Sequence, residues 1–166
     1  METAMRFLPP DFDVPELLET DHYRIRPLTI HDLVRDYDAV MTSREHLWEQ
    51  FGQAWGWPLE DLSLEQDLIE LAWHQREAQR RSSFAYVVMR PDERVQLGCV
   101  YIVPSEKQGF DAAAALWVRA SEVAGGLDEV LYATVRRWLA ERWPFSRVAW
   151  PGRELPWEEY DALLDR

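Results

Sequence analysis

The sequence has a single cysteine and no long uninterrupted apolar segment. Cys99 stands alone among 166 residues, so the chain cannot form an internal disulfide. It lies in an apolar stretch, which favours a buried, unreactive thiol over a nucleophile. No apolar run has the length of a membrane-spanning helix, and the opening METAMRFLPP lacks the order of a signal peptide. We therefore expect a soluble cytoplasmic protein.

Positive charge is also scarce. Lys and Arg number 18 against 30 Asp and Glu, which gives a formal net charge of −12. A nucleic-acid-binding surface needs a basic face, and anionic membranes repel an acidic chain. An arginine cluster, Arg76, Arg80 and Arg81, lies at the end of a predicted helix, where cations offset the helix dipole. We therefore expect neither nucleic acid nor a membrane as a partner.

Motifs for metal or cofactor chemistry are missing as well. The sequence contains no catalytic triad pattern, phosphate-binding loop or dinucleotide fingerprint. Glu70 and His74 stand four positions apart on one predicted helix, which is the spacing of paired metal ligands. Because no third ligand stands in a convincing position, we expect no metal site and an ordinary exposed pair.

The remaining pattern indicates one domain over residues 1–166, with a Pro-rich acidic arm over 1–21. Two capping boxes, Thr29 with Asp32 and Ser63 with Gln66, mark the starts of helices. The apolar positions predict helices over 30–41, 63–81, 127–143 and 157–164, and strands over 22–28, 84–90, 95–103, 112–119 and 147–150. The helix after Ser63 is expected to turn six apolar side chains inward: Leu64, Leu68, Ile69, Leu71, Ala72 and Trp73.

This order predicts a hairpin between the strands at 84–90 and 95–103, with a bulge at Gly98. The strand at 147–150 returns after a helix, so it should lie parallel to the strand at 112–119. Gly125 and Gly126 stand between that strand and its helix, where free backbone N–H groups and the helix dipole can hold an anion. A plain glycine turn explains the same residues.

An aromatic segment over 44–62 forms either a loop or a broken helix. Trp55 and Trp57 flank Gly56 there, and their indoles could line a substrate pocket. Core packing of large rings beneath a loop is the alternative.

Several segments in this order resemble the GNAT superfamily of acyl-CoA N-acyltransferases. The run YRIRPLT at 23–29 is similar to that family's first strand and capped helix. FAYVV at 84–88, followed by LGCV at 97–100, is similar to its hairpin. LWVR at 116–119 and the helix after Gly126 occupy the places of its cofactor strand and cofactor helix. The resemblance covers about residues 22–152.

The resemblance implies an α/β (α+β) fold with a mixed, mainly antiparallel twisted sheet, flanking helices and a splayed last parallel strand pair. It also implies an N-acetyltransferase that uses acetyl-CoA as acyl donor and a small-molecule or peptide amine as acceptor, which attacks the thioester directly. Trp55 and Trp57 would then belong to the acceptor pocket. The implied cofactor-binding residues are Val118, Arg119, Gly125, Gly126 and Leu127.

Three departures from the family pattern support a rival hypothesis. Ser121, Ala124 and Gly126 stand at the positions of the family's cofactor-binding loop, and only Gly126 matches the family's residue there well. Glu122 and Asp128, which flank this loop, would oppose an anionic ligand. No carboxylate lies on the strand at 112–118, so the catalytic residues are unknown. The family's two further strands have no room after Gly152, so we expect an open sheet edge that a homodimer covers. The rival is a catalytically silent GNAT-like binding or assembly module.

Overall fold

A computed structural model describes residues 6–166 and contains one six-stranded sheet in the order β1-β2-β3-β4-β5-β6. The parallel pair is β5 with β6, and the other neighbours are antiparallel. The mixed, mainly antiparallel sheet and its parallel last pair are therefore as expected. The strands are β1 (Leu18–Glu19), β2 (Arg24–Pro27), β3 (Phe84–Met89), β4 (Gln96–Pro104), β5 (Ala112–Val118) and β6 (Val148–Ala149).

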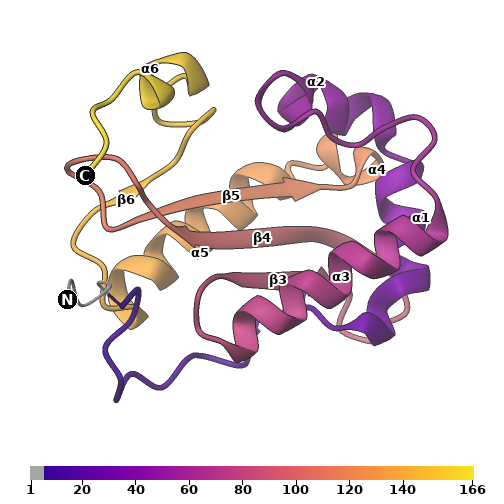
Figure 1. The fold of residues 1–166 in the computed structure, drawn as a ribbon. Coiled ribbons are helices and arrows are strands. Elements are labelled where there is room, and N and C mark those ends of the chain that lie inside the picture. The colour runs from indigo at the N-terminus through magenta and orange to yellow at the C-terminus, as the bar shows by residue number, and fades with distance from the viewer. Residues whose placement is uncertain (1–5) are drawn as a thin grey trace.

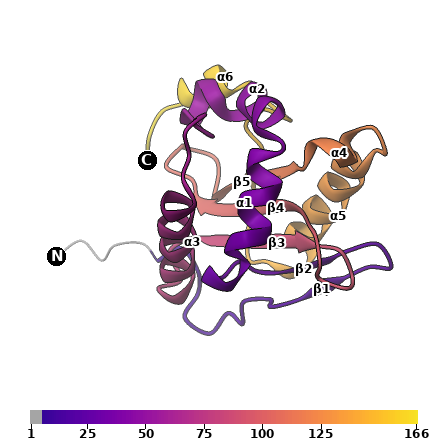
Figure 2. The ribbon, with the colours of Figure 1, turned by 90° about the vertical axis from the view of Figure 1, so that its right-hand side faces the viewer.

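Helices cover both faces of this sheet. Figure 1 shows α3 in front of β3 and β4 with α5 behind them, and Figure 2 shows α1 and α3 on the face opposite α4 and α5. No helix within residues 6–166 is long and apolar enough to cross a membrane. The helices are η1 (Ile30–Asp32), α1 (Leu33–Met41), α2 (Arg44–Trp55), α3 (Leu64–Gln79), α4 (Ala120–Val123), α5 (Leu127–Arg142) and α6 (Trp157–Asp161).

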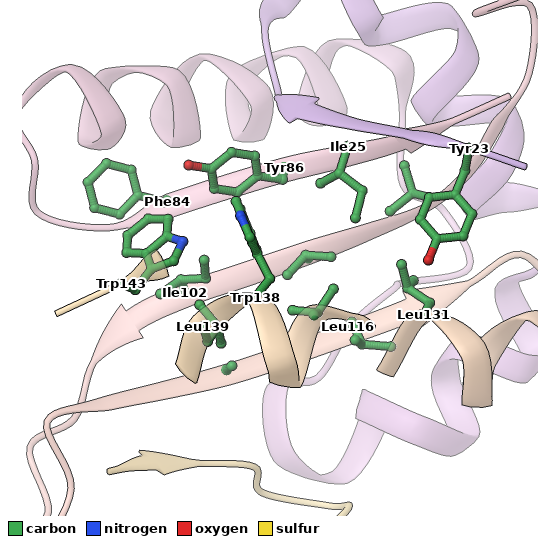
Figure 3. Packing of buried hydrophobic residues seen from close by; sticks show 14 of the residues in the cluster. Tyr23, Ile25, Phe84, Tyr86, Ile102, Leu116, Leu131, Trp138, Leu139 and Trp143 are labelled. Carbon is green, nitrogen blue, oxygen red and sulfur yellow. The ribbon is translucent and has the colours of Figure 1, made fainter. Parts of the chain in front are cut away.

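Each face of the sheet has its own apolar core. On the α5 side, Leu131 and Trp138 point toward Tyr86 and Leu116 of the sheet (Figure 3). On the other side, α1, α2 and α3 pack against the alternate strand residues, including Trp117. All seven residues of β5 are buried, since the strand lies between two helical layers.

Several local structures that the sequence predicts are present between Thr29 and Pro104. Both capping boxes form, at Thr29 and at Ser63. The β3–β4 hairpin is present, and its register shifts between Val88 and Met89, beside Gly98. A Cβ at Gly98 would collide with the backbone carbonyl of Trp117, so glycine is required by the close approach of β5.

Two expectations about the helices need correction. Residues 44–55 form a regular helix, α2, and the irregular part of the aromatic segment begins only after it. In α3, Leu71 is buried, but the other five apolar residues expected inside are exposed. The inward stripe of α3 instead carries Asp67, Glu70 and His74 at helical spacing, beside Leu71. This helix therefore directs polar groups at the sheet and apolar groups at solvent.

Candidate functional site

The edge of β5 is open along most of its length. The β5–β6 ladder consists of two pairs, Ala112 with Val148 and Ala113 with Ala149. Within the described part of the chain, no strand pairs with this edge beyond Ala113. Two side chains approach it instead, because the carbonyl of Leu116 accepts hydrogen bonds from Gln50 Nε2 at 2.9 Å and Arg153 Nη2 at 3.2 Å.

The start of α5 lies just after β5. Gly126 is its N-cap residue, and its φ of 80° is a left-handed conformation that glycine adopts without strain. Within residues 6–166, this helix end has no side-chain capping hydrogen bond. In the first turn, Asp128 forms a two-fold ion pair with Arg153, with both N–O distances at 2.7 Å. Arg153 therefore joins the edge of β5 to the first turn of α5.

The five residues implied to bind the cofactor fall into two groups. Val118 is buried in the core, and Arg119 donates its backbone N–H to Leu97. The Arg119 side chain turns toward α1, where Nη2 lies 3.1 Å from a carboxylate oxygen of Asp38. Only Gly125, Gly126 and Leu127 lie at the helix start, and their role in binding stays a prediction.

The helix start has open backbone but acidic neighbours, since Asp128 and Glu129 stand in its first turn. A Cβ at Gly125 would have its nearest neighbour at 3.7 Å, so the backbone has room around it. The guanidinium of Arg153 supplies a positive charge, although it is already paired with Asp128. Gln50 and Arg153 both bond the Leu116 carbonyl, so any ligand that bonds to β5 at this point must displace them.

A separate pocket lies on the opposite face of the sheet, between α3, the end of α2 and β4. Its volume is about 360 Å³. Trp55 and Trp57 both line it, and their role in acceptor binding stays a prediction. Trp55 is 43% exposed although its ring stacks on buried Phe51 at 4.3 Å. The remaining lining residues are Leu28, Asp36, Asp67, Glu70, Leu71, Trp73, His74, Ser83, Phe84, Tyr101 and Val103.

Two buried carboxyl groups meet in this pocket. Asp36 of α1 and Asp67 of α3 lie close enough to share a hydrogen bond when one of them is protonated, and Asp36 Oδ1 accepts a hydrogen bond from Gln96 Nε2 at 2.6 Å. Burial raises the pKa of Asp67 to about 9, and the adjacent charge of Asp36 adds to this effect. Burial raises the pKa of Asp36 as well. Two carboxyls in contact cannot both ionise easily, so the pair keeps a proton at neutral pH.

The neighbours of this pair are acidic or neutral. Burial raises the pKa of Glu70, and the charge of Asp36 raises it further. Burial lowers the pKa of His74 to about 4, so its imidazole is neutral at pH 7. Burial also raises the pKa of Tyr101, whose hydroxyl accepts a hydrogen bond from Trp117 Nε1 at 3.0 Å. Glu70 and His74 are therefore not the ordinary exposed pair that their spacing suggested.

Aromatic contacts connect the pocket to β5. Trp57 lies 6.1 Å from Trp117 of β5, and Trp55 lies 5.8 Å from Tyr101, measured between ring centroids. Trp55 also meets Trp157 of α6 at 5.5 Å. Since α2 carries both Gln50 and Trp55, one helix borders the open strand edge and the pocket.

Sequence reasoning missed the carboxyl pair. Asp36 and Asp67 lie on different helices, 31 positions apart in the chain, so no local motif connects them. A weak signal did exist, because Asp36 falls among the apolar positions Leu33, Tyr37 and Val40 of its helix. A carboxylate on an apolar stripe is unusual unless it is paired or functional.

Comparisons with known proteins identify the fold. No family model matches the chain, and no curated protein sequence matches it either. Among solved structures, it is similar to the ribosomal-protein-S5-alanine acetyltransferase of Vibrio fischeri, with a TM-score of 0.58 and 18% identity over 77% of this chain and 68% of that one. The ribosomal L7/L12 α-N-protein acetyltransferase RimL in complex with coenzyme A gives 0.58 and 17%, over 74% and 67% of the two chains.

A third structure is the microcin C7 self-immunity acetyltransferase MccE in complex with acetyl-CoA and AMP. Its TM-score is 0.55 at 9% identity, over 72% of this chain and 63% of that one. Together with the strand order, these similarities show that the chain has the GNAT N-acetyltransferase fold. At such low identities, they establish the fold and leave the activity to be argued from the site.

Proposed function

We propose that this protein is an acyl-CoA-dependent N-acyltransferase that transfers an acetyl or similar acyl group to the amine of a small molecule or peptide. One observation carries the proposal: the edge of β5 has no strand partner beyond Ala113 among the described residues, and α2, whose Gln50 bonds the Leu116 carbonyl on that edge, also carries Trp55 of the acidic aromatic pocket. This arrangement offers a donor and an acceptor separate approaches to one strand.

The chain supplies groups for each part of such a reaction. The backbone N–H of Leu127 at the helix start would help to hold the donor's phosphates, whereas the N–H of Gly126 already donates to the carbonyl of Val123. Acetyl-CoA, when bound, supplies a thioester whose carbonyl carbon is open to attack. The pocket would orient the amine, and the Asp36–Asp67 pair, when ionised, would accept the proton that the ammonium must lose before its nitrogen can attack. The new C–N bond replaces the C–S bond, and the leaving sulfur takes up a proton.

Two measurements test this function. The first is thermal melting with and without acetyl-CoA, because a ligand at 100 times its dissociation constant stabilises by about 2.7 kcal/mol. The second is release of the coenzyme thiol, monitored with a thiol reagent, over a panel of primary amines. We expect a melting shift, and thiol release that depends on the amine. If millimolar acetyl-CoA produces neither effect, the proposal is wrong.

The contacts at the edge of β5 favour a second candidate, a silent GNAT-like binding module. Gln50 and Arg153 already bond the Leu116 carbonyl, and Asp128 holds Arg153 in place. If these contacts close the donor site, the parent protein will show no shift with acetyl-CoA, whereas the double variant Gln50→Ala, Arg153→Ala will show one. An acyltransferase gives the shift without any substitution.

A further inference from the structure

We propose that the pocket between α3 and β4 binds a small organic ammonium with an apolar or aromatic body, held by the Asp36–Asp67 pair and enclosed by Trp55, Trp57 and Trp73. The inference rests on the proposed function insofar as this cation would be the acyl acceptor. The binding step itself requires no acyl donor.

In the Asp36–Asp67 carboxyl pair, Asp67 has an oxygen without a hydrogen-bond donor among the described residues, and a cationic ligand supplies a donor together with a positive charge. Asp67 is 1% exposed, and its Oδ2 atom is buried without any hydrogen-bond donor among the described residues. The polar group beside it is the carboxyl of Asp36, which can bond to it only while one of the two holds a proton. A ligand ammonium carries three N–H donors and a positive charge, so it can take the place of that proton and bond to both carboxyls.

The acidic lining of the pocket also favours a cationic ligand. Asp36, Asp67 and Glu70 line it, and none of the residues lining it is Lys or Arg. His74 is neutral for the reason given above. Because the described residues that line the pocket include three acids and no Lys or Arg, the pocket attracts cations and repels carboxylates or phosphates.

The walls of the pocket fit an apolar body next to that charge. Trp55 and Trp73 are 43% and 56% exposed, which leaves large indole surfaces uncovered at the mouth of the cavity. The face of an indole attracts cations, and burial of its apolar surface stabilises a complex. The volume of about 360 Å³ lies at the small end of ligand pockets, so it suits a single ring with a short alkylamine chain.

The polarity of α3 supports a binding role over a purely structural one. The helix turns Asp67, Glu70 and His74 inward and leaves Leu68 and Ile69 in solvent. Burial of unpaired acids lowers stability, and apolar side chains in those positions would avoid this cost. A cationic ligand that neutralises the carboxyls accounts for the arrangement.

Calorimetric titration without acyl-CoA tests the inference with three probes of similar shape. These are phenethylamine as the cation, 3-phenylpropanol as the neutral analogue and 3-phenylpropionate as the anion. We expect phenethylamine to bind about 10-fold or more tightly than either analogue, since a hydrogen bond to a charged group is worth about 1.5–3 kcal/mol. Equal binding of all three, or no binding of phenethylamine at millimolar concentration, overturns the inference.

Matched variants locate the site. Asp67→Asn should weaken phenethylamine binding about 10-fold, and exposed Asp61→Asn, six positions earlier, should not change it. Trp55→Ala should weaken binding about 5-fold by loss of a cation–π contact. Trp48→Ala removes an indole of the same helix that does not line the pocket, so it should have no effect. If Asp67→Asn does not fold, Glu70→Gln serves as the second acidic variant, and unchanged affinity in it contradicts the proposal.

The same probes separate this inference from the proposed function. If phenethylamine binds as described but is not acetylated with acetyl-CoA present, the binding site stands and the acyltransferase proposal fails. If amines are acetylated at rates that none of the pocket variants changes, the enzyme proposal stands and this site is wrong.

Discussion

Replacement of Asp67 by asparagine should remove a large part of the pH dependence of folding stability. In the native protein the pKa of Asp67 is about 9, above its ordinary value of 3.8, so the folded state keeps a proton that the unfolded chain has lost. Stability from this group is therefore complete below about pH 4 and declines as the pH rises toward about pH 9. Asparagine cannot titrate, and its amide can donate to Asp36 in place of the acid proton.

The size of the change in unfolding free energy follows from the one extra proton that the folded state binds. Where the folded state holds one proton more than the unfolded state, the free energy of unfolding falls by about 1.4 kcal/mol for each pH unit. Between pH 6 and pH 8 the parent should therefore lose about 3 kcal/mol, which corresponds to a fall in Tm of about 6–12 °C for a domain of this size. The titratable groups that face the pair are Asp32 of η1, Glu70 of α3, and Cys99 and Tyr101 of β4; among them, the raised pKa of Glu70 changes the stability in the same direction.

Urea unfolding at several pH values, followed by tryptophan fluorescence, measures this slope. We expect the parent and Asp61→Asn to lose stability in parallel, and Asp67→Asn to remain nearly level and to exceed the parent at pH 8. A parent whose stability is constant or rises from pH 6 to pH 8 would show that the carboxyls do not share a proton. A slope that persists in Asp67→Asn would place the titrating group elsewhere.

Three further predictions concern the backbone and the sheet edge. Gly126→Glu should abolish coenzyme A binding in an equilibrium titration while the protein stays folded. Gly126→Ala places a side chain at the same left-handed φ without adding a charge, so an equal loss of binding in both variants would show that backbone strain is responsible. Gly98→Ala should lower stability by about 3 kcal/mol in urea unfolding, because its Cβ meets the Trp117 carbonyl, and Gly125→Ala, where space is available, should change it little. Finally, we expect a homodimer, because β6 has only two residues and the arm strand β1 pairs at the opposite edge of the sheet, which leaves the β6 edge uncovered by the arm. Light scattering that gives the monomer mass of 19.6 kDa at micromolar concentration would refute this expectation.

The sequence predicted the order of strands and helices because each element carries a local signal. The capping oxygens of Thr29 and Ser63 act within three residues, and the β3–β4 hairpin follows from two apolar runs around a short turn. The parallel β5–β6 pair follows from the single helix between them. Such short-range rules need no knowledge of what the side chains meet across the fold.

The site was less predictable because its contacts cross the chain. Arg153 meets Asp128 and Leu116, which lie 25 and 37 positions away, and no pattern in the sequence connects them. Asp36 reaches Gln96, 60 positions on, for the same reason. The sequence alone placed Gly125 and Gly126 at the start of a helix. It did not predict whether the nearby edge of β5 is free of hydrogen-bond partners.

The error at α3 is itself informative. Helical periodicity assigns a buried face to whichever stripe is apolar, and that rule succeeds when burial of apolar area determines the orientation of a helix. In α3 the rule selects Leu68 and Ile69, yet Leu71 packs in the core and the polar residues on either side of it line the pocket. Places where local rules fail tend to be functional sites, since stability alone gives no reason to bury Asp67 against Asp36. The reversed polarity of this helix is therefore an argument for the pocket that does not depend on resemblance to any other protein.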